Sequence, residues 1–169
     1  KLLPQNTAAL LIGTWKYAER NYFKTIATDN KPCTLVADPS QNDSIVSEGQ
    51  AYWMRIAAIM PRIDPLHAAD YQDRFNELLN GYLAMVQLAK NADKHNELAA
   101  WAVRISRGKL VLNTAKEKPA FSASDADLDS VMALIQAQKN VADKLWVAHS
   151  YTPAIRRFIP AVRKLFEKR

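Results

Sequence analysis

The sequence has little cysteine, little glycine and no long hydrophobic run. One cysteine, Cys33, excludes an internal disulfide framework and a zinc site built from cysteines. Four glycines among 169 residues exclude a collagen-like chain, and 49% hydrophobic residues exclude a disordered one. No apolar run reaches about 18 residues, so we expect no membrane span. The composition predicts one compact domain over residues 1–169.

Positive charge is concentrated at the end of the chain. The net charge is +6, and residues 156–169 carry +5 of it, which leaves the rest almost neutral. No nucleic-acid-binding motif accompanies this segment, so we expect a solvated basic helix and no nucleic-acid partner. A basic helical module that binds anionic partners remains an alternative, and it would bind with a steep salt dependence.

Apolar residues recur with helical spacing through most of the sequence, which predicts an all-α fold of about six helices. The fifth helix is expected to bury Leu128, Val131, Met132 and Ile135, and the sixth to bury Ile155, Phe158, Ile159, Val162 and Phe166. Loops are expected over Asp29–Asp43 and Thr114–Ala123, and a short strand over Lys109–Asn113. The expected helices cover Thr7–Tyr22, Ser47–Met60, Tyr71–Val86 and Glu97–Ile105, with the last two starting at Ser124 and Thr152.

The second helix starts with an unusual group of residues. Ser47 and Gln50 fit a capping box, and Glu48 in the first turn suits the helix dipole. Gly49 is less easily explained, because glycine in a helix costs about 0.5–1 kcal/mol relative to alanine. A ligand or a packed helix that approaches the backbone closely would explain it. Tyr52 and Trp53 follow and offer flat aromatic surfaces.

The fifth helix starts with three aspartates in five residues. Ser124 and Asp127 again resemble a helix cap, but capping needs fewer carboxylates. Asp125 and Asp129 are four residues apart and therefore repel each other on one helix face. A site that needs several hydrogen-bond acceptors, such as a sugar site or a metal site, would offset that repulsion. The spacing does not continue as a calcium-binding loop, and the histidines lack metal-ligand spacing, so we expect no metal.

Together the two acidic helix starts suggest acid–base chemistry. One carboxylic acid can protonate a glycosidic oxygen while a second carboxylate activates water. For Glu48 to serve as the acid, burial and a nearby carboxylate must raise its pKa against the effect of the helix dipole. Trp53, Tyr52 or Trp101 would supply sugar-stacking surfaces, or would simply belong to the core.

Two segments resemble the signature sequences of glycoside hydrolase family 8. They are Ser47-Glu48-Gly49-Gln50-x-Tyr52-x-Met54 and Ala123-Ser124-Asp125-Ala126-Asp127-Leu128-Asp129. Residues 73–78 and 98–101 resemble the family's intervening helices, and Trp15, Tyr17 and Tyr22 resemble its first helix. The resemblance therefore covers most of the chain.

The resemblance implies a toroid of six inner and six outer helices that hydrolyses β-1,4-linked polysaccharide with inversion and without a cofactor. It implies that Glu48 is the general acid and that Asp125 binds the sugar at the cleavage point, so these two residues are the catalytic candidates. Related enzymes act on cellulose, mixed-linkage glucan, chitosan or xylan, and the resemblance points to a secreted or periplasmic location. The candidates for substrate binding are Asp127, Asp129, Trp101, Tyr52 and Gln50.

The sequence departs from the family pattern at two places. Ala51 and Trp53 stand where the family has glycines, which narrows the space beside Glu48. Twelve helices need roughly 300 residues, so this chain would form about half of a toroid and lacks the family's general base. Half a toroid leaves apolar faces exposed, which predicts self-association or a partner chain. The alternative to an endoglucanase-like enzyme is an inactive relative that binds a glycan or a partner protein.

Overall fold

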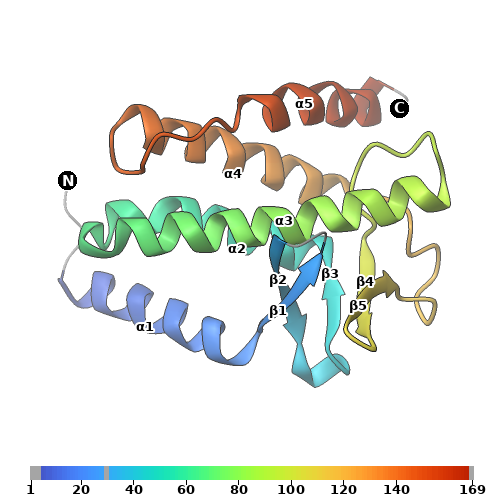
Figure 1. The fold of residues 1–169 in the computed structure, drawn as a ribbon, viewed down its shortest axis with the longest axis horizontal. Helices are drawn as coiled ribbons and strands as arrows, with labels where there is room; N and C mark the ends of the chain where they lie inside the picture. Colours follow the sequence, from blue (N-terminus) through green and yellow to red (C-terminus); the bar gives the residue numbers. More distant parts are fainter. Residues whose placement is uncertain (1–4, 29–30, 168–169) are drawn as a thin grey trace.

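The computed structural model describes residues 5–28 and 31–167 and contains a five-stranded sheet and five α-helices (Figure 1). Among these residues, no helix combines the length and apolar character that crossing a membrane requires. Short 3₁₀ turns occupy Pro39–Gln41, Met60–Arg62 and Pro65–His67. The helices are α1 (Gln5–Asn21), α2 (Ser47–Ile59), α3 (Ala68–Ala92), α4 (Ser124–Ala142) and α5 (Thr152–Glu167). The strands are β1 (Phe23–Thr28), β2 (Lys31–Asp38), β3 (Ser44–Val46), β4 (Ala102–Ser106) and β5 (Lys109–Leu112).

The prediction of an all-α half-toroid is wrong, because the described residues form a mixed α/β structure. Strand β2 lies in the predicted loop Asp29–Asp43, of which Asp29 and Asn30 fall outside the described residues, and β3 follows directly after that loop. Strand β4 lies in the predicted fourth helix, Glu97–Ile105. That segment is too short to distinguish a helix period from a buried strand, and its Val103 and Ile105 are β-branched residues that favour strands. The predicted strand near Lys109 is confirmed as β5.

The sheet is antiparallel with the strand order β1-β2-β3-β4-β5. Strand β3 leads directly into α2, and its last residue, Val46, pairs with Ala102 at the start of β4. This register holds the first residue of α2 next to Trp101. The short strand β3 therefore decides where the acidic start of α2 lies.

Helix α3 packs on both strand β2 and helix α2, and α2 packs in turn on α4. In Figure 1, α4 and α5 lie on one side of α3, while α1 and the sheet lie on the other. Gly81 permits the close approach of α3 to β2, because a Cβ added there would lie 2.3 Å from the Thr34 carbonyl oxygen. The core follows these contacts and includes the buried Leu35, Phe75 and Leu78.

Helices α2 and α4 run parallel. Their contacts follow the same order along both helices, from Arg55 and Asp129 to the hydrogen bond from Asn140 to the Ala58 carbonyl oxygen (2.6 Å). A further ion pair joins Arg62, just after α2, to Asp143, just after α4. Two parallel helices place their N-termini at the same end, so the two acidic helix starts face the same region.

The buried face of α4 differs from the predicted one. Leu128, Met132 and Ile135 are 45%, 48% and 44% exposed, and only Val131 of the predicted set is buried. Besides Val131 and Leu134, helix α4 buries small and polar residues, which a hydrophobic pattern does not reveal: Ala126, Asp127, Ser130, Ala133, Ala137 and Asn140. In α5, Phe158 and Val162 are buried as predicted, whereas Ile159 and Phe166 are exposed.

Candidate functional site

The starts of α2 and α4 are joined through the residues that precede β4. The Ser47 N–H donates to the Trp101 carbonyl oxygen (3.0 Å), and the Trp101 N–H donates to the Phe121 carbonyl oxygen (2.7 Å). Ser47 opens α2, and Phe121 lies three residues before α4. The backbone at Trp101 therefore links the two acidic motifs, which are more than 70 residues apart in the sequence.

Glu48, Asp125 and Asp127 form an acidic cluster at the two helix starts, and Asp127 is its buried member. Its Oδ1 accepts a hydrogen bond from the Tyr82 hydroxyl (2.6 Å), and its Oδ2 has no partner with hydrogen-bond geometry among the described residues. Burial is the largest influence and raises the pKa of Asp127 to about 6. The Tyr82 hydroxyl and the nearby Ala99 amide lower this pKa, while the carboxylates of Asp125 and Glu48 raise it further. The carboxyl group can therefore gain or lose a proton near neutral pH.

Glu48 and Asp125 lie on the more accessible side of the cluster. Glu48 is half-buried in the first turn of α2, where the Ser47 hydroxyl is 3.4 Å from its Oε2. Asp125 is exposed in the first turn of α4, and its Oδ1 accepts from the Ala126 N–H (3.0 Å). Both carboxylates lie near enough to Asp127 to raise its pKa. Glu48 and Asp125 thus lie within electrostatic reach of Asp127 at two helix N-termini, where the unpaired N–H groups favour negative charge.

Neither helix start uses the predicted side-chain cap. The N-cap residues are Val46 and Ala123, and neither helix has a side-chain cap hydrogen bond. In α2, the Gln50 side chain does not complete a capping box because it points into the core and binds the Val36 N–H. In α4, the Asp127 side chain does not do so because it binds the Tyr82 hydroxyl. The motifs that resembled capping boxes therefore place polar groups inside the protein.

Gln50, a predicted substrate-binding residue, is fully engaged by the backbone. Its Oε1 accepts from the Val36 N–H (2.9 Å), and its Nε2 donates to the carbonyl oxygens of Thr34 (2.9 Å) and Leu78 (2.8 Å). The side chain is buried between β2, α2 and α3. These hydrogen bonds connect α2 to β2 and to α3 two residues after Glu48.

The other predicted binding residues have different surroundings. Tyr52 is 56% exposed and contacts Trp53 edge-on, with a centroid distance of 6.1 Å. Trp101 is half-buried, and its Nε1 donates to the carbonyl oxygens of Glu117 and Lys118, both at 3.1 Å. Asp129 forms an ion pair with Arg55 (2.7 Å), so its charge is already matched.

The sequence analysis did not identify Tyr82 and Arg55 as parts of this site. Tyr82 lies inside the helix predicted over Tyr71–Val86, and its hydroxyl supplies the only hydrogen bond that an Asp127 side-chain oxygen accepts from another side chain in the described structure. A buried tyrosine needs a hydrogen-bond partner for its hydroxyl, so a tyrosine at a buried helix position indicates that a polar side chain lies close to it. Among the described residues, no group of three or more His, Cys, Asp or Glu side chains is arranged to hold a metal ion.

No protein-family model and no curated protein matches the sequence. Among solved structures, the chain is similar to the apo structure of a β-1,3-1,4-glucanase from Paenibacillus sp. X4, with a TM-score of 0.67 and 23% sequence identity. The match covers 97% of this chain and 38% of that chain. This similarity supports a shared fold over a region that is well under half of the glucanase.

The resemblance to glycoside hydrolase family 8 is corrected together with the fold. It implied half of a toroid built from helices alone, whereas the described residues form a five-stranded sheet packed against helices. No family model supports the assignment either. The inverting mechanism and the toroid that the resemblance implied are therefore not carried further.

Proposed function

We propose that this chain binds a β-glucan and hydrolyses its glycosidic bonds at the starts of α2 and α4. The observation that carries the proposal is the group of three carboxyl side chains at these two helix starts, one of them buried with its pKa raised to about 6. Most glycoside hydrolases use two carboxyl groups in different protonation states, and this cluster combines the buried Asp127, whose pKa is raised, with the exposed Asp125. The glucanase activity named for the structural neighbour agrees with this chemistry.

The proposed roles follow the exposure of each side chain. Glu48 is half-buried beside two other carboxylates and donates a proton to the leaving glycosidic oxygen. Asp125 is exposed at the adjacent helix start and serves as the second carboxylate, and a water molecule supplies the oxygen that replaces the leaving glycosidic oxygen on the sugar. Asp127 is fully buried, so it does not contact the substrate. Its protonation state instead acts on Glu48 and Asp125 through electrostatic interaction. Tyr52 and Trp101 offer the aromatic surfaces for the sugar rings.

The test measures reducing sugar released from mixed-linkage β-glucan and from carboxymethyl-cellulose. We expect Glu48→Gln and Asp125→Asn each to lower the rate at least 100-fold, because an amide can neither donate the proton nor carry the charge. Asp73→Asn is the matched control, because Asp73 is an exposed carboxylate on α3 outside the cluster. Full activity in Glu48→Gln would remove Glu48 from the mechanism.

A second candidate function is glycan binding without turnover. The observation that favours it is Tyr52, which is 56% exposed one helical turn after Glu48 and offers an aromatic surface for stacking without any catalytic group. In that case, cello-oligosaccharides would bind in a calorimetric titration, Glu48→Gln would bind them equally well, and the unmutated chain would release no product. Measurable turnover by the chain alone would exclude this candidate.

A further inference from the structure

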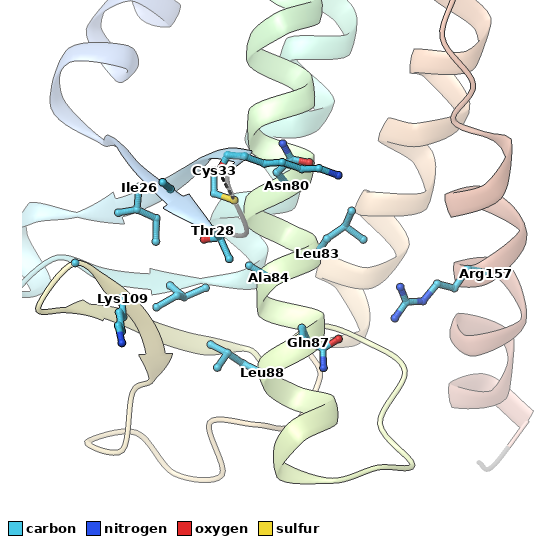
Figure 2. A pocket seen from close by; sticks show the side chains of 14 residues that line it. Ile26, Thr28, Cys33, Asn80, Leu83, Ala84, Gln87, Leu88, Lys109 and Arg157 are labelled. Carbon is cyan, nitrogen blue, oxygen red and sulfur yellow. Dashed lines mark hydrogen bonds between the residues drawn. The ribbon is translucent and has the colours of Figure 1, made fainter.

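A hollow lies between the β1–β2 hairpin, α3 and the β4–β5 hairpin (Figure 2). Its volume is about 640 Å³, which is within the range of small-molecule sites. Its apolar lining includes Ile26 and Cys33 from the first hairpin, Leu83 and Leu88 from α3, and Leu110 from β5. None of the lining residues belongs to the acidic cluster at the starts of α2 and α4.

The charged residues that line this hollow are all positive: Lys31, Lys109 and Arg157, with no Asp or Glu. In Figure 2, Arg157 extends from α5 toward the side chains of α3, and Lys109 lies at the β4–β5 turn. Lys109 and Arg157 form no ion pair with any described residue. Glu97 is within electrostatic reach of Arg157, but its carboxylate is bound by Lys164 at 2.9 Å.

Two of the uncharged polar side chains in the lining donate hydrogen bonds within the protein. The Asn80 amide donates to the Pro32 carbonyl oxygen (3.0 Å), and the Gln87 amide donates to Asn91 Oδ1 (2.7 Å). A sugar or a nucleotide needs several polar contacts along its length, whereas a hydrocarbon chain needs only apolar surface. The hollow therefore combines an apolar floor with a cationic rim.

We propose that this hollow binds a free amphiphilic carboxylate of the fatty-acid type. Its hydrocarbon chain lies along Leu83, Leu88 and Leu110, and its carboxylate lies beside Arg157 at one end of the hollow, while Lys109 at the opposite end adds to the positive potential. Burial of the chain supplies most of the affinity, and the two cations select a negative headgroup over a neutral or positive one. This site is independent of the proposed glucan hydrolysis.

The test is a calorimetric titration with monomeric decanoate, below the concentration at which it forms micelles. We expect saturable binding with one site per chain, binding at least tenfold weaker for decyltrimethylammonium, and none for acetate. The paired substitution Lys109→Gln with Arg157→Gln should weaken decanoate binding at least tenfold. Arg163→Gln is the control, because it removes a charge from α5 outside the lining.

A further variant, Ala84→Trp, fills the hollow and should abolish decanoate binding. Its thermal unfolding is measured in parallel, and if it does not fold, the charge variants decide the outcome. The proposal is overturned if decanoate shows no saturable binding, if Arg163→Gln weakens binding as much as the paired substitution, or if the protein binds phosphatidylglycerol vesicles but not decanoate. Glu48→Gln should leave decanoate binding unchanged, so the result is separable from the fate of the hydrolase proposal.

Discussion

Two polar side chains are buried on different sides of α3, and their hydrogen bonding differs. On the side of β2 and α2, the Gln50 amide makes three hydrogen bonds to backbone groups. On the side of α4, the Asp127 carboxyl accepts one side-chain hydrogen bond, and its Oδ2 has no partner in the described structure. A fully satisfied buried group stabilises the fold, whereas a charged and partly satisfied one costs stability. The hydrogen bonds of Gln50 therefore serve the stability of the fold, whereas the incomplete hydrogen bonding of Asp127 is what a functional site would require.

The largest effect is expected for Gln50→Leu. The substitution leaves the Val36 N–H and the carbonyl oxygens of Thr34 and Leu78 buried without these partners. Each such group costs about 1–3 kcal/mol, so the free energy of unfolding should fall by about 3–9 kcal/mol. Urea denaturation measures this change. A loss below about 1 kcal/mol would show that Gln50 is not the structural clamp we describe.

Gly81→Ala tests the same region through sterics. The added Cβ would lie 2.3 Å from the Thr34 carbonyl oxygen and 2.9 Å from Gln50 Nε2, so α3 must move away from β2. We expect a loss of about 3 kcal/mol in unfolding free energy, as for an overpacked core. Gly13→Ala is the control, since a Cβ there meets nothing within 4 Å, and it should stabilise α1 slightly. Equal stability of the two variants would contradict the close packing of α3.

The Asp127 region is tested by the pH dependence of stability. The folded pKa of about 6 lies above the ordinary value of 3.8, so the folded protein holds this proton more tightly than the unfolded chain. This tighter proton binding adds about 2–3 kcal/mol to the free energy of unfolding below about pH 4, and the contribution is lost as the pH rises through about 6. Asp127→Asn should remove this dependence and be at least as stable as the unmutated protein at pH 7. An unchanged pH profile, measured by thermal unfolding against Asp73→Asn, would refute the raised pKa.

The smallest effect is expected for Gly49→Ala beside Glu48. An added Cβ would lie 3.8 Å from Val46 Cγ2 and 4.0 Å from Val36 Cγ1, which is ordinary van der Waals contact. No packed helix therefore explains this glycine, and alanine should raise the free energy of unfolding by about 0.5–1 kcal/mol. If a glucan approaches the backbone here, the same variant should lose hydrolysis or glycan binding. Stability and glycan assays on one preparation separate these two effects.

The long helices could be predicted from the sequence, whereas most of the sheet could not. Helices α2 and α4 begin at Ser47 and Ser124 as predicted, because helical spacing is clear over a dozen or more residues. Strand β3 has only three residues, Ser44–Val46, and gives no periodic signal. Strand β2 is buried continuously from Cys33 to Ala37, so it lacks the alternation that marks a half-buried strand. Pairing between such short segments depends on tertiary contacts.

The acidic motifs were visible as unusual helix starts, but the environment of each side chain was not. Sequence spacing separates Asp127 from Asp125 and Asp129 on the helix, and the structure adds that Asp127 is buried against Tyr82 while Asp129 pairs with Arg55. Gln50 belonged to the same motif as Glu48, yet it lies in the core. The hydrogen-bond partners lie 14 to 28 positions away for Gln50 and 45 positions away for Asp127, so spacing within a motif cannot supply them.

The parallel arrangement of α2 and α4 gives this part of the molecule an electrical polarity. Aligned peptide dipoles place partial positive charge at the end with Glu48 and Asp125, and partial negative charge at the end with Arg62 and Lys139. Side chains of opposite sign therefore compensate both ends of the helix pair. Because mobile ions screen such compensation, the separation between α2 and α4 should be most sensitive to ionic strength at their ends and least sensitive at the small residues in the middle.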